Sequence, residues 1–178
     1  MAAPLALSVS DVRTILAYDR AVFDRYVRRV RRLSGAAARR KRGTGHESLF
    51  ATLVHILNVR EVWLVYIVRG RTSDAELEKL FHDPARRPKD WRGFDAYRRR
   101  VERAIEATVR GWTPRDLGRR VSVFWMPGQY TVRDAVLQVT FEEAHHLGEI
   151  IGALWQDDVE PPAMTWLDLA RAAARRRR

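Results

Sequence analysis

A signal that starts helices recurs five times along the chain, and it constrains the fold more than any other feature. The pattern is Ser or Thr followed three residues later by Asp or Glu, and these side chains together bond the free amides of a first helical turn. Each instance alone is weak, but together they divide the chain into helices. The five pairs are Ser8 with Asp11, Thr44 with Glu47, Ser73 with Glu76, Thr113 with Asp116, and Thr131 with Asp134.

Apolar residues at helical spacing follow these signals and predict four long helices, at about 10–34, 46–69, 94–111 and 131–155. The segments between them differ in kind. A linker is expected first, and then a long crossover that contains one short helix. β-forming residues around the turn "MPGQ" predict a small hairpin, and the chain closes on a short amphipathic helix. These segments are 34–45, 70–93 with a helix near 74–81, 119–132 and 164–178.

The element order predicts an all-α fold, a four-helix bundle with a long crossover, a small β-hairpin before helix four and a short C-terminal helix. A chain of 178 residues can bury a core, so we expect one domain, 1–178. The first residues lack the basic region and apolar run of a signal peptide, and His55 and Asn58 interrupt the most apolar stretch. We therefore expect a cytoplasmic protein with no membrane span.

The chain is strongly basic, with 33 lysines and arginines against 22 aspartates and glutamates, a net charge of +11. This balance makes a polyanion such as nucleic acid a conceivable partner. Part of the charge is concentrated in "RRKR" at 39–42 and "RRRR" at 175–178. The other arginines alternate with apolar positions at helical spacing, which is typical of solvated helix faces. Without a helix-turn-helix unit or interleaved aromatic residues, nucleic acid is not the favoured partner.

The stretch "VTFEEAHHLGEII", residues 139–151, contains the first candidate metal ligands. Glu142 and His146 are four residues apart and therefore lie on one face of a helix, separated by roughly one turn of about 5.4 Å. Apolar residues share that face, so the pair is expected to point inward. A buried carboxylate is costly unless it is paired or bound to a cation, and a metal ion would satisfy both side chains.

His55 is the candidate third ligand, because it lies in the middle of the second long helix, and facing helices of a bundle can converge on one ion. The chain has no cysteine, so any metal site must use histidine, carboxylate and water. Two histidines and one glutamate with an open position form the ligand set of a catalytic zinc site, and they also suit nickel, iron or manganese.

Other interpretations of the same residues remain open. His55 alone is also compatible with a hydrogen-bonded core histidine, and Glu142 with His146 is compatible with a pair within one helix. Glu143 and His145 point about 100° away and are expected to flank the site or to serve as alternative ligands. His46, at a helix start, and His82, in the crossover, are expected to be exposed. A dinuclear carboxylate site lacks the second Glu-x-x-His pair that it requires.

Three stretches together resemble the DinB/YfiT-like family of small metal-binding proteins: "LFATLVHILNVREVWL", "HLGEI" and the closing "PPAMTWLDL". The resemblance extends over nearly the whole chain, in its helix lengths, crossover and hairpin. It implies a four-helix bundle that binds one divalent metal ion, usually zinc or nickel, through three side chains, and that often forms homodimers.

Carried over by position, His55 matches the family's helix-two ligand, and His146 matches the histidine of its usual His-Arg-Gly-Gln. The commonest family pattern has another histidine where this chain has Glu142. The related mycothiol-dependent maleylpyruvate isomerases look like a His, Glu, His version of the same triad. Leu147 and Glu149 replace the usual arginine and glutamine, and these departures put the substrate and subfamily in doubt.

The resemblance implies a metal-dependent enzyme, of a thiol S-transferase or detoxification type or a hydrolase, because a bound metal lowers the pKa of a thiol or water in its open position. Its partners would be a small-molecule substrate and a low-molecular-weight thiol. Trp125, Tyr130 and Trp63 are candidates for the pocket wall. The alternative is a non-catalytic nucleic-acid-binding protein with at most a structural metal, whose affinity would fall steeply with salt.

Overall fold

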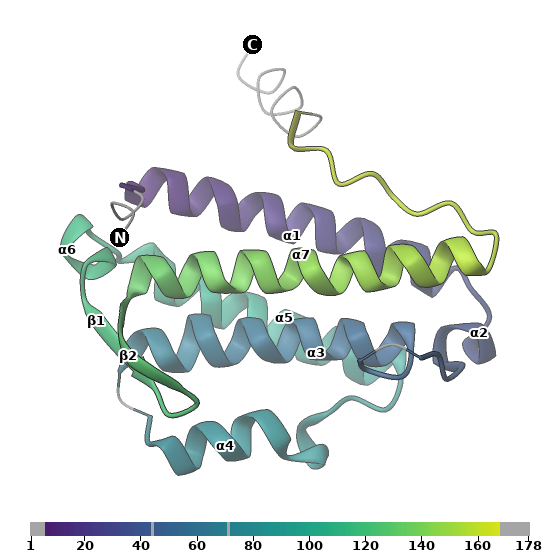
Figure 1. Ribbon diagram of the computed structural model, residues 1–178, viewed down its shortest axis with the longest axis horizontal. Helices are drawn as coiled ribbons and strands as arrows, with labels where there is room; N and C mark the ends of the chain where they lie inside the picture. Colours follow the sequence, from purple (N-terminus) through teal and green to yellow (C-terminus); the bar gives the residue numbers. More distant parts are fainter. Residues whose placement is uncertain (1–5, 44, 71, 168–178) are drawn as a thin grey trace.

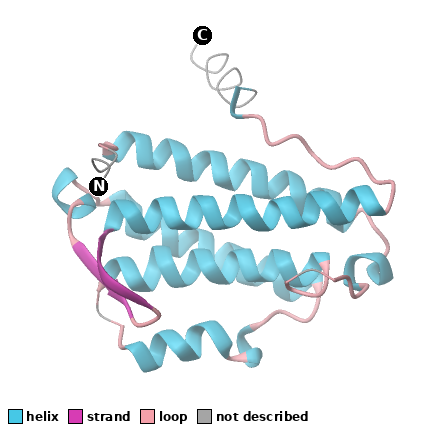
Figure 2. Ribbon diagram, in the orientation of Figure 1, coloured by secondary structure: helices cyan, strands magenta, loops and turns pink. Residues whose placement is uncertain are grey.

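The computed structural model describes residues 6–43, 45–70 and 72–167 of the chain. Over these residues the fold is all-α apart from one small hairpin, as the sequence predicted (Figures 1 and 2). The elements in chain order are α1 (Val9–Arg31), α2 (Gly35–Arg39), α3 (Leu49–Glu61), α4 (Asp74–His82), α5 (Trp91–Arg110), α6 (Pro114–Leu117), β1 (Arg120–Val123), β2 (Met126–Thr131) and α7 (Val132–Gln156).

Helices α1, α3, α5 and α7 form the bundle, with α7 between α1 and α3 in Figure 1 and α5 behind them. Helix α4 belongs to the crossover and packs outside α3. The antiparallel β1–β2 hairpin covers the end of the bundle where α7 begins. After α7 the chain turns back along α1, where the hydroxyl of Tyr26 donates to the carbonyl of Pro162 at 2.7 Å.

Four of the five predicted helix-start signals are confirmed as reciprocal capping boxes, at Ser8, Ser73, Thr113 and Thr131. The fifth pair, Thr44 with Glu47, is not fully described. Thr44 lies outside the described residues, and the helix begins three residues later than expected. Ser48 caps it instead, and the Ser48 side chain accepts a hydrogen bond from the amide of Ala51.

Two segments differ from the sequence prediction. The expected linker contains a short helix, α2, because the Ser34 side chain accepts from the amide of Ala37 and caps it. The second long helix does not stay α-helical to its end: after Glu61 it passes through a π-helical turn at Val62–Tyr66 and a 3₁₀ turn at Ile67–Arg69. Only the first residues of the predicted closing helix are described, and 168–178 lie outside the described residues.

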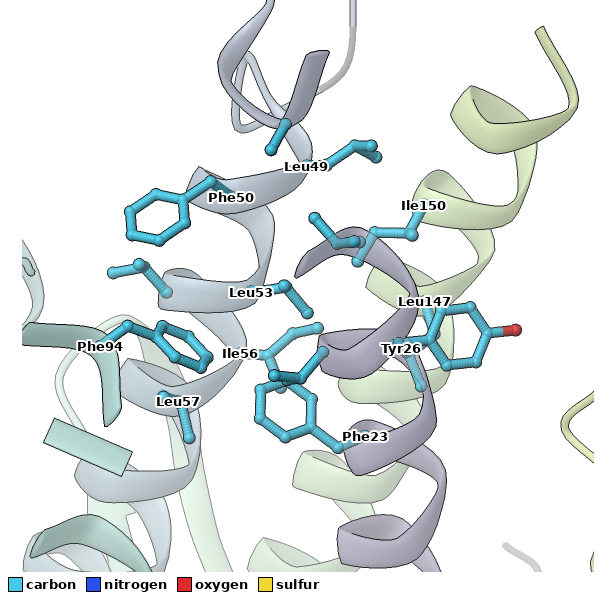
Figure 3. Packing of buried hydrophobic residues seen from close by; sticks show 14 of the residues in the cluster. Phe23, Tyr26, Leu49, Phe50, Leu53, Ile56, Leu57, Phe94, Leu147 and Ile150 are labelled. Atoms are coloured by element: carbon cyan, nitrogen blue, oxygen red, sulfur yellow. The ribbon is translucent and has the colours of Figure 1, made fainter. Parts of the chain in front are cut away.

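The core between the four helices is apolar and closely interleaved (Figure 3). Phe23 and Tyr26 from α1 meet Leu53 and Leu57 from α3, and Leu147 packs from α7. All five side chains are at most 1% exposed. Burying side chains of this size contributes about 1.5–3 kcal/mol each to the stability of the fold. The core therefore holds α3 and α7 in fixed positions relative to each other.

The segment Leu49–Arg69 is long and apolar enough to span a membrane by length and composition, but 78% of its most apolar window is buried inside the bundle. Its apolar character is therefore explained by its place at the centre of the fold. It is not a clear membrane span.

The basic run 39–42 is largely built into the fold. Arg40 and Arg42 both pair with Asp157 at the end of α7, the second at 2.5 Å. Arg39 donates to the carbonyl of Lys89 and lies over the ring of Phe50. These arginines connect the segment between α1 and α3 to α7 and to the crossover. Their charges therefore stabilise the fold.

Candidate metal centre

Three histidines from different parts of the chain meet on one side of the bundle. His55 comes from α3, His146 from α7 and His46 from the loop before α3. Their candidate ligand atoms all lie within 4.8 Å of one another. The rings of His46 and His55 are stacked with centroids 3.7 Å apart, and the His55 and His146 centroids are 4.6 Å apart. Three histidines whose ring nitrogens lie this close to one another form a candidate metal site.

Glu142 approaches the same place from α7. Its Oε1 lies 3.9 Å from Nε2 of His55 and 3.9 Å from Nε2 of His146. The His55 imidazole lowers the pKa of the Glu142 carboxyl, and it outweighs burial, which acts the other way. Glu142 is therefore an anion with one oxygen facing both rings. Its other oxygen accepts from Gln138 Nε2 at 3.0 Å.

Among the described residues, two groups have candidate ligand atoms that lie within 4.8 Å of one another: His46, His55 and His146, and His145, His146 and Glu149. Glu142, predicted from the sequence as a ligand, is in neither group, but its Oε1 is 3.9 Å from both His55 and His146. Neighbouring ligand atoms in a tetrahedral zinc site lie about 3.3 Å apart, from the usual metal–ligand distances of about 2.0–2.1 Å. The 3.9 Å separations from Glu142 to the two histidines are longer than this, and imidazole and carboxylate are ligand types that a divalent ion accepts.

Glu149 fixes the orientation of His146. The two side chains are hydrogen-bonded, with Nδ1 of His146 2.9 Å from Oε2 of Glu149. Burial alone would raise the pKa of Glu149, but the contact with His146 lowers it overall, so the carboxylate accepts the Nδ1 proton. That tautomer leaves the Nε2 lone pair of His146 directed towards His55 and Glu142, as metal-ligating histidines require.

His46 is the residue that sequence reasoning missed. The sequence suggested an exposed histidine on the first turn of the second long helix. The helix instead begins after Ser48, and Glu47 adopts a left-handed conformation with φ of 60°. The turn brings His46 back over His55. A Cβ added at Gly45 would lie 3.3 Å from Glu149, so the same loop also packs closely on the carboxylate that orients His146. The serine cap is the one sequence signal that pointed to a loop here.

Of the two flanking candidates on α7, Glu143 lies outside the histidine cluster, whereas His145 forms a second group of candidate ligands with His146 and Glu149. Glu143 is buried and points to the other side of α7, where its oxygens accept from Nε and Nη2 of Arg60 at 2.7 and 2.9 Å. Burial raises the pKa of Glu143 to about 7, although Arg60 opposes the rise. His145 is on the rim, with its side chain 70% exposed and Nε2 4.0 Å from Glu149.

The three aromatic residues predicted to wall the pocket are placed elsewhere. Trp63 and Trp125 pack edge to face at 5.9 Å near the hairpin, and the hydroxyl of Tyr130 donates to the carbonyl of Pro127. They are absent from the residues that line the cavity beside the histidines. Trp63 follows His55 by eight residues, about 12 Å along a helix, which takes it beyond α3 into the π-helical turn Val62–Tyr66.

A cavity of about 310 Å³ opens directly beside His46 and His55. Phe50 and Val54 from α3 form apolar walls, and Arg87 from the crossover brings a positive charge to the edge. Small-molecule sites in proteins are typically cavities of this kind and size, mostly apolar with a few polar groups. The histidine cluster therefore faces a space that a small molecule can enter.

The metal-free protein should lose stability in mild acid because of His46. Burial, followed by the neighbouring His55 and His146, lowers the pKa of His46 from 6.5 to about 4. The unfolded chain therefore binds this proton more readily, so the stabilisation is complete above pH 6.5 and is lost as the pH falls towards 4. Allowing for partial solvent access, we expect a loss of roughly 1–2 kcal/mol. Urea unfolding at pH 7 and 4.5 in chelator measures it, and His46→Gln should show a smaller loss. Equal losses of stability in the wild type and in His46→Gln would show that His46 is not the cause.

Comparison with known proteins gives a family and a fold. Residues 18–150 match the model of the DinB superfamily. The structure is similar to the crystal structure of a DinB-like protein from Bacillus cereus ATCC 10987, with a TM-score of 0.66 and 15% identity over 88% of this chain and 97% of that one. No curated protein matches the chain. The family match spans most of the chain and both α3 and α7, and it confirms the resemblance seen in the sequence: this chain belongs to the DinB superfamily.

Proposed function

We propose that the protein binds one divalent metal ion at His55, His146 and Glu142 and is a metal-dependent enzyme that acts on a small molecule. The observation that carries the proposal is the convergence of donor side chains from α3, from α7 and from the loop before α3 on one point. Within a bundle, that arrangement of buried and half-buried donors is costly unless the groups are paired or bind a cation.

His46 would be the exchangeable donor of this site. It lies on a loop, whereas His55 and His146 are held by helices that pack through the core. It also lines the cavity, so its side of the cluster is the side from which a substrate would arrive. We propose that His55, His146 and Glu142 hold the ion, and that His46 occupies a position which a substrate atom takes over.

The donor set favours zinc or nickel, since imidazole and carboxylate suit both and the chain offers no thiolate. A bound divalent ion supplies Lewis acidity and lowers the pKa of a thiol or water that coordinates it. Around it, Glu149 would keep the proton of His146 on Nδ1, and Glu142 would contribute a negative charge. Arg87 would attract an anionic group of the substrate into the cavity beside His46.

We propose thiol transfer as the reaction type, with hydrolysis as the variant in which water replaces the thiol. In the first case an external low-molecular-weight thiol loses its proton to solvent, its sulfur forms a bond to an electrophilic carbon, and the leaving group departs with its electron pair. The chain has no cysteine, so the thiol must come from solution. A panel of small thiols with a chromogenic aryl halide tests this, with release of halide expected only from metal-loaded protein.

The decisive test of the site is metal content. Untagged protein prepared without chelator should carry about one zinc or nickel ion per chain, and His55→Ala should lose it. His46→Ala should keep the ion, because the other three donors remain. His82→Ala is the matched control, since that histidine is 70% exposed on α4. Metal that persists in His55→Ala, or that is absent from every protein after divalent ions are added, would refute the proposal.

A cytoplasmic homodimer remains our proposal for assembly and location. Phe141 and Trp155 are 66% and 57% exposed on α7 and are separated by about four helical turns, so they share one face. A pair of large exposed apolar side chains on one helix face favours contact with a second copy. Light scattering should give twice the mass of a chain, and Phe141→Asp with Trp155→Asp should give a monomer. If the wild-type protein is a monomer, the homodimer proposal is wrong.

The nucleic-acid alternative gains no support from the described arginines. Several of those on α1 and α5 are committed to carboxylates, as in Arg31 with Asp95 at 2.5 Å and Arg100 with Glu61 at 2.5 Å. Such pairing lowers the charge that is available to phosphates. We therefore keep the metal-dependent enzyme as our proposal.

A further inference from the structure

A second cleft, of about 460 Å³, lies between α1 and α5. It is distinct from the cavity beside the histidines, because the two share no lining residue. Its walls are mainly apolar, and several wall side chains are only partly covered by the rest of the protein. The apolar lining consists of Leu16 and Ala17 from α1, Leu64 from the π-helical turn after α3, and Ile105 and Val109 from α5.

Positive charge dominates the polar part of this cleft, where four arginines face two glutamates. Both glutamates are already neutralised. Glu102 is 3.0 Å from Arg20 and accepts from Nε of Arg98 at 2.8 Å, and Glu106 is 2.9 Å from Arg110. An anion entering the cleft would therefore meet a net positive lining, because it does not compete with free carboxylates.

Arg13 adds a charge that has no carboxylate partner among the described residues. Its Nη2 donates to the carbonyl of Arg110 at 2.9 Å, at the C-terminal end of α5. This contact suits the negative end of the helix dipole, but it leaves a full positive charge at the rim.

Arg60 forms the floor of the cleft and has an unused donor. The side chain of Arg60 is 6% exposed, and Nε and Nη2 both bond Glu143. The third nitrogen, Nη1, has no hydrogen-bond partner among the described residues. Arg60 lines the cleft, so a ligand there can reach its guanidinium. An arginine with a free N–H is a strong hydrogen-bond donor to a carboxylate.

We propose that this cleft binds a small amphipathic anion, a carboxylate or sulfonate that carries one apolar chain or ring. The acidic group would accept from Nη1 of Arg60, with Arg13 and Arg20 at the rim, and the apolar part would lie against Leu16 and Ile105. A neutral or cationic ligand of the same shape would gain the apolar contact but not the ionic hydrogen bond. The cleft is a second ligand site of the molecule, independent of the metal centre.

Dodecanoate, below its critical micelle concentration, is the probe for an aliphatic ligand, and 1-naphthoate is the probe for an aromatic one. Calorimetric titration of wild-type protein should show one saturable site for at least one of these anions. Dodecyltrimethylammonium and dodecanol should bind at least tenfold more weakly than dodecanoate. These comparisons need no variant. Equal binding of the anionic, neutral and cationic amphiphiles, or no saturable binding of either anion, would overturn the proposal.

Ala17 allows the charge to be tested by substitution, because it is exposed on α1 yet lines the cleft. Ala17→Glu should weaken anion binding at least tenfold more than Ala17→Gln, which adds the same bulk without the charge. Ala107→Glu, at an exposed position of α5 outside the cleft, should bind like wild type. His55→Ala should also bind like wild type, which separates this site from the metal centre. If Ala17→Glu and Ala17→Gln bind equally, the ligand lies elsewhere.

Discussion

Replacing Arg60 by Leu is expected to lower the free energy of unfolding by about 3–5 kcal/mol, because it leaves the carboxyl group of Glu143 buried without its partner. Both side chains are almost fully enclosed, at 6% and 3% exposure, and two charge-assisted hydrogen bonds join them. The pair links α3 to α7 one residue away from Glu142. Urea unfolding at neutral pH, monitored by tryptophan fluorescence, measures the loss.

The double replacement Arg60→Leu with Glu143→Leu separates the cost of an unpaired charge from the value of the pair itself. Buried ion pairs often contribute little beyond what apolar side chains of similar volume provide. We therefore expect the double variant to recover most of the lost stability. A double variant as unstable as Arg60→Leu alone would show that the hydrogen bonds, rather than charge compensation, hold the two helices together.

The same double variant also tests whether the metal centre and the α1–α5 cleft bind their ligands independently. Arg60 lines the α1–α5 cleft, and Arg60 and Glu143 together line a small void with Glu142 and His146. The ion pair therefore lies between the cleft and the candidate metal centre. Metal content should survive in the double variant, since it retains all the proposed ligands, whereas binding of dodecanoate should be lost with Nη1.

The helix pattern and the pair on α7 could be predicted because they depend on local spacing. Glu142 and His146 must share a face if the segment is helical, whatever surrounds it. His55 could be added only by assuming that the helices face each other in a bundle, and the distances of 3.9 Å from Glu142 to both histidines agree with that assumption.

His46 could not be placed from the sequence, because its position depends on the turn that precedes α3. The helix cap at Ser48 and the left-handed backbone at Glu47 direct the loop back over His55. The sequence analysis offered Thr44 with Glu47 as the helix start, whereas the structure begins the helix after Ser48. Such choices between neighbouring caps move a loop side chain from solvent into a site.

Arg60 and Glu61 show a different limit of sequence reasoning. Two adjacent charges in the most apolar helix indicate buried ionic partners, because neither can face lipid or a dry core alone. Their partners are distant in the chain. Arg60 pairs with Glu143, whereas Glu61, 1% exposed, accepts from Tyr97 at 2.9 Å and pairs with Arg100. The π-helical turn that follows Glu61 has no counterpart in the sequence pattern either.

Removal of Glu149 is expected to weaken zinc binding about 10–100-fold, the usual cost of losing a carboxylate that orients a metal-ligating histidine. Glu149→Ala leaves Nδ1 of His146 without its acceptor, so the ring can rotate and the proton can move to Nε2. Glu149→Gln keeps an oxygen that can accept from Nδ1 and removes only the charge. We expect an intermediate affinity for it, measured by competition with a chromogenic zinc chelator.

The control for this prediction must remove a nearby negative charge without touching His146. Glu47→Ala does so, because Glu47 lies in the loop that carries His46 and is 69% exposed. If loss of Glu149 acts by weakening the negative field around the ion, Glu47→Ala should have a comparable effect. If it acts by fixing the tautomer, Glu47→Ala should bind zinc within about twofold of wild type, which is less than the smallest loss expected from Glu149→Ala. Wild-type affinity in Glu149→Ala would mean that the core packing of α7 alone holds His146, and the 2.9 Å contact would then be a consequence of its position.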